Sequence, residues 1–218
     1  MFCKMETVGM KRIQNYLDST CKENMVIFIL LSIVLPILGD ISIVGVEEME
    51  TIEWKLQQYL SFFYSASIVF LFVIVFLPYI GEDGREVLYL QRRIHFFEVV
   101  GITSFLVINL LATCCWWKNK LETINFFYIK NFIMIVCFSS LCYFLIYVFK
   151  NITVFAIIAF CFFLVTFINP FGLFYVNACN VWQSGIEILC SMWEYLLMIV
   201  ICLPIGLYAN WKYSDYSI

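Results

Sequence analysis

Long apolar runs, separated by short polar stretches, dominate the chain. Six runs approach or exceed the roughly 20 mainly apolar residues that a helix needs to cross a bilayer. They cover residues 25–46, 59–80, 99–117, 131–149, 152–168 and 188–211. Apolar and polar residues do not alternate within them, as they would in the strands of a membrane barrel. Backbone polar groups in lipid must pair within their own segment, so the pattern predicts an all-α, polytopic membrane protein with six transmembrane helices.

The fifth and sixth runs are separated on the basis of a proline. Residues 151–186 carry no charge but are too long for a single span. Pro170 interrupts them, because proline breaks a helix and disfavours the helical conformation of the residue before it. The remaining apolar piece, Phe171–Ile186, is predicted to be a re-entrant outer segment, with a simple extracellular loop as the alternative.

The distribution of lysine and arginine predicts the orientation. If the N-terminus is inside, nine basic residues fall on the inner side: Lys4, Lys11, Arg12, Lys22, Arg85, Arg92, Arg93, Lys150 and Lys212. Four fall on the outer side: Lys55, Lys118, Lys120 and Lys130. Positive charge is enriched on the cytoplasmic side of membrane proteins, which favours both termini in the cytoplasm. We expect the membrane to be the plasma membrane. Tryptophans near predicted span ends, Trp116, Trp117, Trp193 and Trp211, fit interfacial belts.

Two segments outside the spans have amphipathic character. In residues 1–24, Met10, Ile13 and Leu17 share one face, which predicts a helix lying in the inner interface. Residues 81–98 form the longest cytoplasmic connection between spans and carry a partial apolar face with arginines beside it. Such a helix can either dock on a soluble partner or lie among lipid headgroups.

Composition narrows the function classes. Apolar residues make up 63% of the 218 and charged residues only 13%, which predicts a single domain surrounded by lipid. The net charge of −3 and the absence of a basic stripe argue against a nucleic-acid partner. The ten cysteines include no CxxC pair and His95 is the one histidine, so we predict no metal site and treat the cysteines as small apolar residues.

The order of these elements resembles the membrane subunit of ABC-2 type transporters. That family has an interfacial N-terminal helix, six spans, a cytoplasmic coupling helix between spans two and three, and re-entrant outer helices between spans five and six. The stretch Glu82–Leu90 resembles the family's acidic-Gly-x-x-x-Leu-Leu type sequence, although Gln91, Arg92 and Arg93 stand where the family usually has a proline. The end of the chain, with Tyr208, Trp211, Lys212 and Asp215, is also similar to the family.

This resemblance implies a permease subunit without its own motor. The chain has no phosphate-binding G-x-x-x-x-G-K-[ST] loop, so ATP and Mg²⁺ would be bound by a separate cytoplasmic ATPase subunit, in two copies. A second permease subunit, identical or different, would complete the path. The exported substrate would be a peptide, a lantibiotic or other antibiotic, or another amphipathic molecule. Residues implied to contact the ATPase are Gly84, Arg85, Glu86, Leu88, Leu90, Arg92 and Arg93.

Polar residues inside predicted spans are candidates for the translocation path, because they are costly to bury in lipid. The candidates are Asp40, Asn109 and Glu194. Asp40 and Glu194 lie near helix ends, where they can instead reach water. For Asn109 and the pair Ser139–Ser140, we predict hydrogen bonds to neighbouring helices as the favoured alternative. The outer side also carries Glu47, Glu48, Glu50 and Glu53, which either attract cationic cargo or form a solvated loop.

Two further classes of function remain open at this point. One is a non-ABC small transporter or substrate-binding membrane module, although we detect no inverted repeat. The other is an intramembrane enzyme, although the chain has no HExxH motif, no paired intramembrane carboxylates and no serine–histidine arrangement. We therefore expect a protein that is not catalytic by itself.

Overall fold

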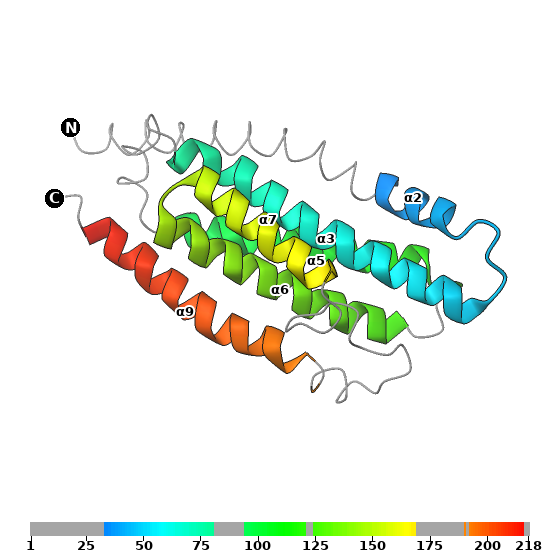
Figure 1. The fold of residues 1–218 in the computed structure, drawn as a ribbon. Helices are drawn as coiled ribbons and strands as arrows, with labels where there is room; N and C mark the ends of the chain where they lie inside the picture. Colours follow the sequence, from blue (N-terminus) through cyan, green and yellow to red (C-terminus); the bar gives the residue numbers. More distant parts are fainter. Residues whose placement is uncertain (1–32, 81–93, 121–123, 169–189, 191, 216–218) are drawn as a thin grey trace, which may run out of the picture.

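The computed structural model describes residues 33–80, 94–120, 124–168, 190 and 192–215. Over these residues the chain is helical and contains no strand, which confirms the all-α prediction there. The helices are α2 (Leu35–Ser42), α3 (Met49–Ile80), α5 (Ile94–Trp116), α6 (Ile124–Phe149), α7 (Ile152–Ile168) and α9 (Trp193–Asp215) (Figure 1). The predicted interfacial helix 1–24 and the re-entrant segment 171–186 lie outside the described residues.

Within the part of the chain that the structure describes, four helices are long and apolar enough to cross a membrane. Their apolar stretches are Thr51–Leu77, Glu98–Trp116, Asn125–Phe149 and Trp193–Lys212. They correspond to the predicted spans 59–80, 99–117, 131–149 and 188–211, and they support a polytopic membrane protein. A shorter apolar helix, α7, coincides with the predicted span 152–168.

Several helix ends differ from the predicted spans, and two of them share a reason. Helix α3 begins at Met49 rather than at residue 59, and α6 begins at Ile124 rather than at residue 131. The predictions stopped at charged or amide side chains, which these two helices instead contain. Helix α9 begins at Trp193 rather than at residue 188. In the described part of the first predicted span, the helix ends at Ser42, and a turn with Gly45 at φ 82° follows.

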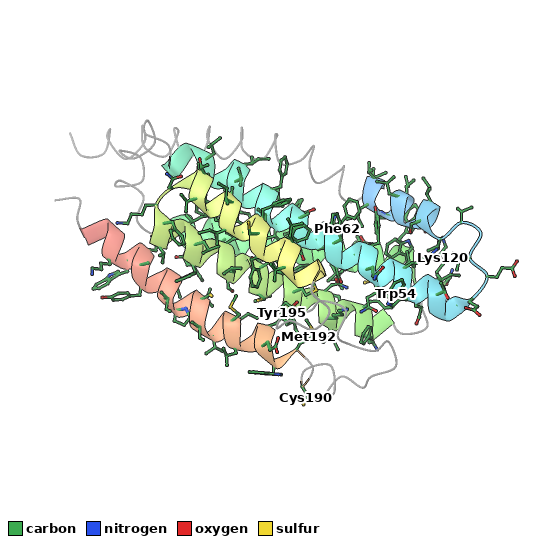
Figure 2. The ribbon with its side chains drawn as sticks, viewed as in Figure 1. Trp54, Phe62, Lys120, Cys190, Met192 and Tyr195 are labelled. Carbon is green, nitrogen blue, oxygen red and sulfur yellow. The ribbon has the colours of Figure 1, made fainter. Side chains whose placement is uncertain are left out.

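The helices alternate in direction, and α6 lies at the centre of the bundle (Figure 1). It packs against α3, α5, α7 and α9, while α2 packs on α3 and α5. We call the end of the bundle where α2 joins α3 the α2–α3 end. Figure 2 shows Trp54 of α3 and Lys120, which follows α5, at this end. The opposite end holds the α6–α7 connection and the C-terminal end of α9 (Figure 1).

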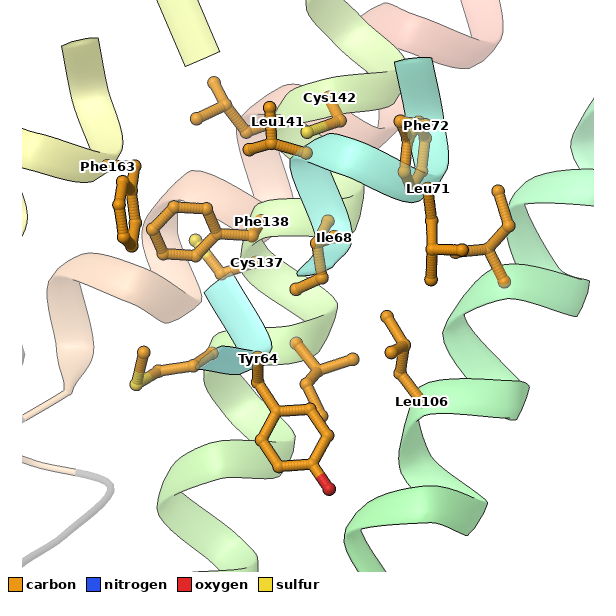
Figure 3. Packing of buried hydrophobic residues seen from close by; sticks show 14 of the residues in the cluster. Tyr64, Ile68, Leu71, Phe72, Leu106, Cys137, Phe138, Leu141, Cys142 and Phe163 are labelled. Atoms are coloured by element: carbon orange, nitrogen blue, oxygen red, sulfur yellow. The ribbon is translucent and has the colours of Figure 1, made fainter. Parts of the chain in front are cut away.

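The half of the bundle that lies away from the α2–α3 end has an apolar interior. Ile68, Leu71 and Phe72 of α3 are buried against α5 and α6, with Leu106 and Phe138 around them (Figure 3). The rings of Phe72 and Phe76 are stacked with centroids 5.5 Å apart. We call Ile68, Leu71, Phe72, Leu106 and Phe138 the apolar layer.

Helices α6 and α9 approach closely because Gly206 has no side chain. A Cβ atom at Gly206 would lie 2.7 Å from Cδ1 of Tyr143 and 3.3 Å from the Cα of Phe144. One turn further along α9, the amide of Asn210 donates a hydrogen bond of 2.8 Å to the hydroxyl of Tyr143. Small residues and interhelical hydrogen bonds are common where membrane helices cross.

The outer surface of the helices is apolar. Phe70, Ile157 and Val200 are among many large apolar side chains that are exposed on it, a surface that suits lipid rather than water. Trp193 and Trp211 are exposed near the two ends of α9, separated by about 27 Å at the rise of a helix. This spacing is close to the thickness of a bilayer core, as the interfacial belt predicted for these two residues requires.

Candidate functional site

The residues predicted to contact an ATPase lie outside the described part of the chain. Gly84, Arg85, Glu86, Leu88, Leu90, Arg92 and Arg93 all belong to residues 81–93. The structure does fix the helices on either side of them, since α3 ends at Ile80 and α5 begins at Ile94. Residues 94–98 of the predicted connection are therefore the start of α5.

Asp40, a candidate for the translocation path, is bound by three donors at the α2–α3 end. Its Oδ1 accepts hydrogen bonds of 2.8 Å from Nε1 of Trp117 and 2.8 Å from Nζ of Lys120. Its Oδ2 accepts a bond of 3.2 Å from Nε1 of Trp116. The contact with Lys120 is also an ion pair, in which both side chains are partly exposed. Asp40 thus fastens α2 to the end of α5.

Gly39, the neighbour of Asp40, makes this attachment sterically possible. A Cβ atom at Gly39 would collide with Cζ2 of Trp117. Trp117 is completely buried here, beside Tyr59, so its prediction as an interfacial residue is wrong. Trp116, the other half of the pair, is exposed as predicted. Trp117 is buried and Trp116 is exposed because successive side chains on a helix point in different directions.

We expect Asp40→Asn to lower the free energy of unfolding by about 1 kcal/mol, since the ion pair is partly exposed and the amide cannot hold the Lys120 ammonium as tightly. Denaturation of the purified protein in detergent micelles would measure the change. Glu47→Gln is the matched control, because Glu47 is an exposed carboxylate at the same end and its replacement is expected to change little. Equal stability of Asp40→Asn and the parent would show that the attachment of α2 does not depend on this charge.

Asn109, the second candidate, joins two helices through a tyrosine. The hydroxyl of Tyr64 on α3 donates a hydrogen bond of 2.8 Å to Oδ1 of Asn109 on α5. The same hydroxyl lies 3.2 Å from Oγ1 of Thr113, whose own hydroxyl donates to the carbonyl of Asn109. All three residues are buried. The interhelical role predicted as the alternative for Asn109 is therefore what the structure shows.

Asn109 belongs to a larger set of buried polar residues on α3, α5 and α6, and sequence reasoning missed the others as site residues. We call it the polar seam: Glu53, Gln57, Ser61, Tyr64 and Ser65 of α3, Asn109 and Thr113 of α5, and Lys130 and Asn131 of α6. Ser61 donates a hydrogen bond of 3.3 Å to Oδ1 of Asn131, whose amide in turn donates to the carbonyl of Phe127. The four-residue spacing of positions 53, 57, 61 and 65 was the signal available in the sequence.

The seam buries two charged residues of opposite sign. Glu53 is 1% exposed and Lys130 is 0% exposed. The ammonium of Lys130 lies 6.0 Å from the centroid of the Phe126 ring, within reach of a cation–π interaction. Two predictions are corrected by this burial: Glu53 is not part of an exposed acidic surface, and Lys130 is not a residue of an outer loop. The continuation of α3 and α6 beyond the predicted spans places both within helices.

The remaining polar candidates do not converge on this site. Glu194 is half-buried in the first turn of α9. Ser140 donates a hydrogen bond of 2.7 Å to the carbonyl of Val136 in its own helix, so its predicted interhelical bond is wrong. Ser139 is buried on α6, and its Oγ makes no hydrogen bond to any residue described by the structure.

The thiols offer no metal centre in the part of the chain that the structure describes. There, no group of three histidine, cysteine, aspartate or glutamate side chains is placed to hold a metal ion. Cys114, Cys137, Cys142 and Cys202 are free thiols buried in helices, where they pack as small apolar side chains.

Comparison of the chain with protein-family models, with curated proteins and with solved structures found no match. The arguments for function therefore come from the sequence and the geometry of this chain.

Proposed function

We propose that this protein is the transmembrane permease subunit of an ATP-driven ABC exporter that moves a peptide, an antibiotic or another amphipathic substrate. In this proposal it lies in the plasma membrane with both termini in the cytoplasm. A separate ATPase subunit binds ATP and Mg²⁺, and two of its copies serve a pair of permease subunits. The proposal rests on the resemblance of residues 82–90 to the coupling segment of ABC-2 permeases and on the way in which the flanking helices are tied together.

The tie between α3 and α5 is the structural observation that supports the proposal. Residues 81–93 connect these two helices, and the Tyr64 hydroxyl, at the middle of α3, bonds α3 to α5. Ser61 and Asn131 add a bond from α3 to α6. A displacement of residues 81–93 by a closing ATPase would therefore move three helices together as one rigid body, the kind of movement by which transport proteins switch state.

Co-purification tests the proposal directly. The tagged protein, extracted in mild detergent from its own cells, is expected to bring down a nucleotide-binding protein whose ATP hydrolysis depends on the permease. Arg92→Glu with Arg93→Glu is expected to reduce the recovered partner by about tenfold, which corresponds to about 1.4 kcal/mol of binding free energy. Mass spectrometry and an ATPase assay would measure the two quantities.

A second charge reversal provides the control. Lys212 is exposed at the same end of the bundle, near the C-terminal end of α9, so Lys212→Glu changes the charge there without altering residues 81–93. We expect it to leave the partner bound. Recovery of no ATP-hydrolysing protein with the parent chain, or undiminished recovery with the arginine variant, would contradict the proposal.

One observation favours a different transporter class. Ionisable residues buried in membrane helices often lie on ion pathways, and Glu53 and Lys130 are such residues. A carrier driven by an ion gradient would use them, and its transport in vesicles would stop with an ionophore and continue without ATP. The proposed permease would show the reverse dependence.

A further inference from the structure

One buried face of α3 changes character halfway along the helix. Glu53, Gln57, Ser61, Tyr64 and Ser65 occupy its first part, and Ile68, Phe72 and Phe76 continue the same face, as their spacing of three or four residues requires. The residues of α5 and α6 that pack against this face change from polar to apolar at the same point along α3. Asn109 and Thr113 of α5 and Asn131 of α6 make hydrogen-bonding contacts with the first part. Leu106, Cys137 and Phe138 lie beside the second part (Figure 3).

The first part contains buried acceptors with no hydrogen-bonding partner. Oε1 of Gln57 and Oγ of Ser65 make no hydrogen bond among the residues that the structure describes, although both residues are almost completely buried. Leaving such an atom unsatisfied costs about 1–3 kcal/mol. Native proteins avoid this cost by placing ordered water at buried polar atoms that lack a protein partner.

The buried charges of the seam also favour bound water, because hydration lowers the free-energy cost of burying them. Taking an ammonium or a carboxylate out of water costs several kcal/mol per ion even after relaxation of the protein. Glu53 is buried on α3 one turn before Gln57, and Lys130 is buried on α6 next to Asn131 in the sequence. Water in the seam would raise the local dielectric constant and lower the cost of holding both charges there.

The seam begins close to a polar end of the bundle. Glu53 lies one turn after the start of α3 at Met49, and the preceding Glu47 and Glu48 are exposed. Asp40 and Lys120 form their partly exposed ion pair at the same end. Water is therefore available at the α2–α3 end, and the apolar layer closes the far end of the seam (Figure 3).

We propose that the polar seam is a hydrated half-channel: it binds a file of water molecules, opens only at the α2–α3 end and stops at the apolar layer. The bound ligand is water, held by the side chains of Gln57, Ser61 and Ser65 on α3 and by Asn131 on α6. The apolar layer excludes water because it offers no polar partner, and a buried water needs two to four of them. This proposal does not rest on the proposed transport function.

Thiol labelling of the full chain in liposomes tests the proposal. Ser65→Cys and Gln57→Cys would be exposed to a charged, membrane-impermeant methanethiosulfonate reagent. The native Cys142 is a matched control in the same molecule, since it is buried within the apolar half (Figure 3). The reagent is charged and reacts with thiols that water reaches, so we expect positions 57 and 65 to react at least about tenfold faster than Cys142. Mass spectrometry assigns each modification to its residue.

Radiolytic footprinting tests the same point without any substitution. Hydroxyl radicals form from water and oxidise nearby side chains, so Tyr64 in the seam should be oxidised at least about tenfold faster than Phe72 in the apolar layer if ordered water lies beside it. Both side chains are completely buried, so exposure to bulk solvent does not distinguish them.

The outcomes separate clearly. Labelling of positions 57 and 65 from the α2–α3 side, with oxidation of Tyr64 above that of Phe72, supports the half-channel. Equal oxidation of Tyr64 and Phe72 in the parent chain overturns it, whatever the cysteine variants do. Two results would contradict the proposal that the water file stops at the apolar layer. One is labelling of positions 57 and 65 from the opposite side of the membrane, and the other is reaction of Cys142 in the parent chain as fast as the cysteine at position 65 in its variant.

Discussion

Lys130→Met is expected to lower the free energy of unfolding by about 3–5 kcal/mol, as is typical when one member of a buried charged set is removed. Lys130 is completely buried, and the described residues contain one other buried charged side chain, Glu53. Methionine fills a similar volume but leaves the seam with a net negative charge. Denaturation in detergent micelles would measure the loss, and a change below about 1 kcal/mol would contradict the burial of a charged ammonium.

A second lysine and a double substitution complete this test. Lys120→Met removes an ammonium that is 42% exposed, so we expect a loss of no more than about 1 kcal/mol. Glu53→Gln combined with Lys130→Met removes both charges. We expect the double variant to be more stable than the sum of the single losses predicts, by about 1–3 kcal/mol. Strict additivity would show that the two buried charges do not compensate each other.

Phe72→Ala is expected to lower the free energy of unfolding by about 3–5 kcal/mol, the usual range for removing a buried phenylalanine. Phe72 has no exposed surface, and its ring is stacked on that of Phe76. The alanine leaves a cavity in the apolar layer, where the surrounding side chains lose their contacts and cannot all collapse into the space. The same denaturation measurement applies.

Phe70 is the matched control for this substitution. It lies two residues away on the same helix, but its side chain is 60% exposed on the outer surface. There, lipid chains replace the contacts that the ring loses, so Phe70→Ala is expected to cost less than about 1 kcal/mol. Equal losses at positions 70 and 72 would show that the face of α3 toward α6 has been misassigned.

The apolar runs predicted the helices well because a backbone surrounded by lipid must form its own hydrogen bonds. An uncharged segment surrounded by lipid satisfies its backbone hydrogen bonds by forming a helix. Accordingly, α7 coincides with its predicted range, and α5 ends within one residue of its predicted end. The helix ends were predicted less well where a polar side chain is buried against another helix. Gln57 and Asn131 appear as span boundaries in the sequence, but each lies inside a longer helix.

The candidate site was only partly visible in the sequence for the same reason. Asn109 was singled out because it interrupts an apolar run, whereas Glu53 and Lys130 were assigned to loops because they flank such runs. Hydropathy reports the average surroundings of a segment and contains no information on which face of a helix meets a neighbour. The buried position of Trp117 depends on contact with Gly39, a residue far away in the chain.

The unequal lengths of α3 and α7 have a consequence for the surrounding bilayer. At the usual rise, the 32 residues of α3 extend for about 48 Å, whereas the 17 residues of α7 extend for about 26 Å. A hydrocarbon core of about 30 Å cannot match both. Tilting relieves the excess length of α3, and local thinning of the lipid relieves the shortage beside α7. The tilt of α3 and the thinning of the lipid beside α7 therefore depend on the length of the acyl chains in the bilayer.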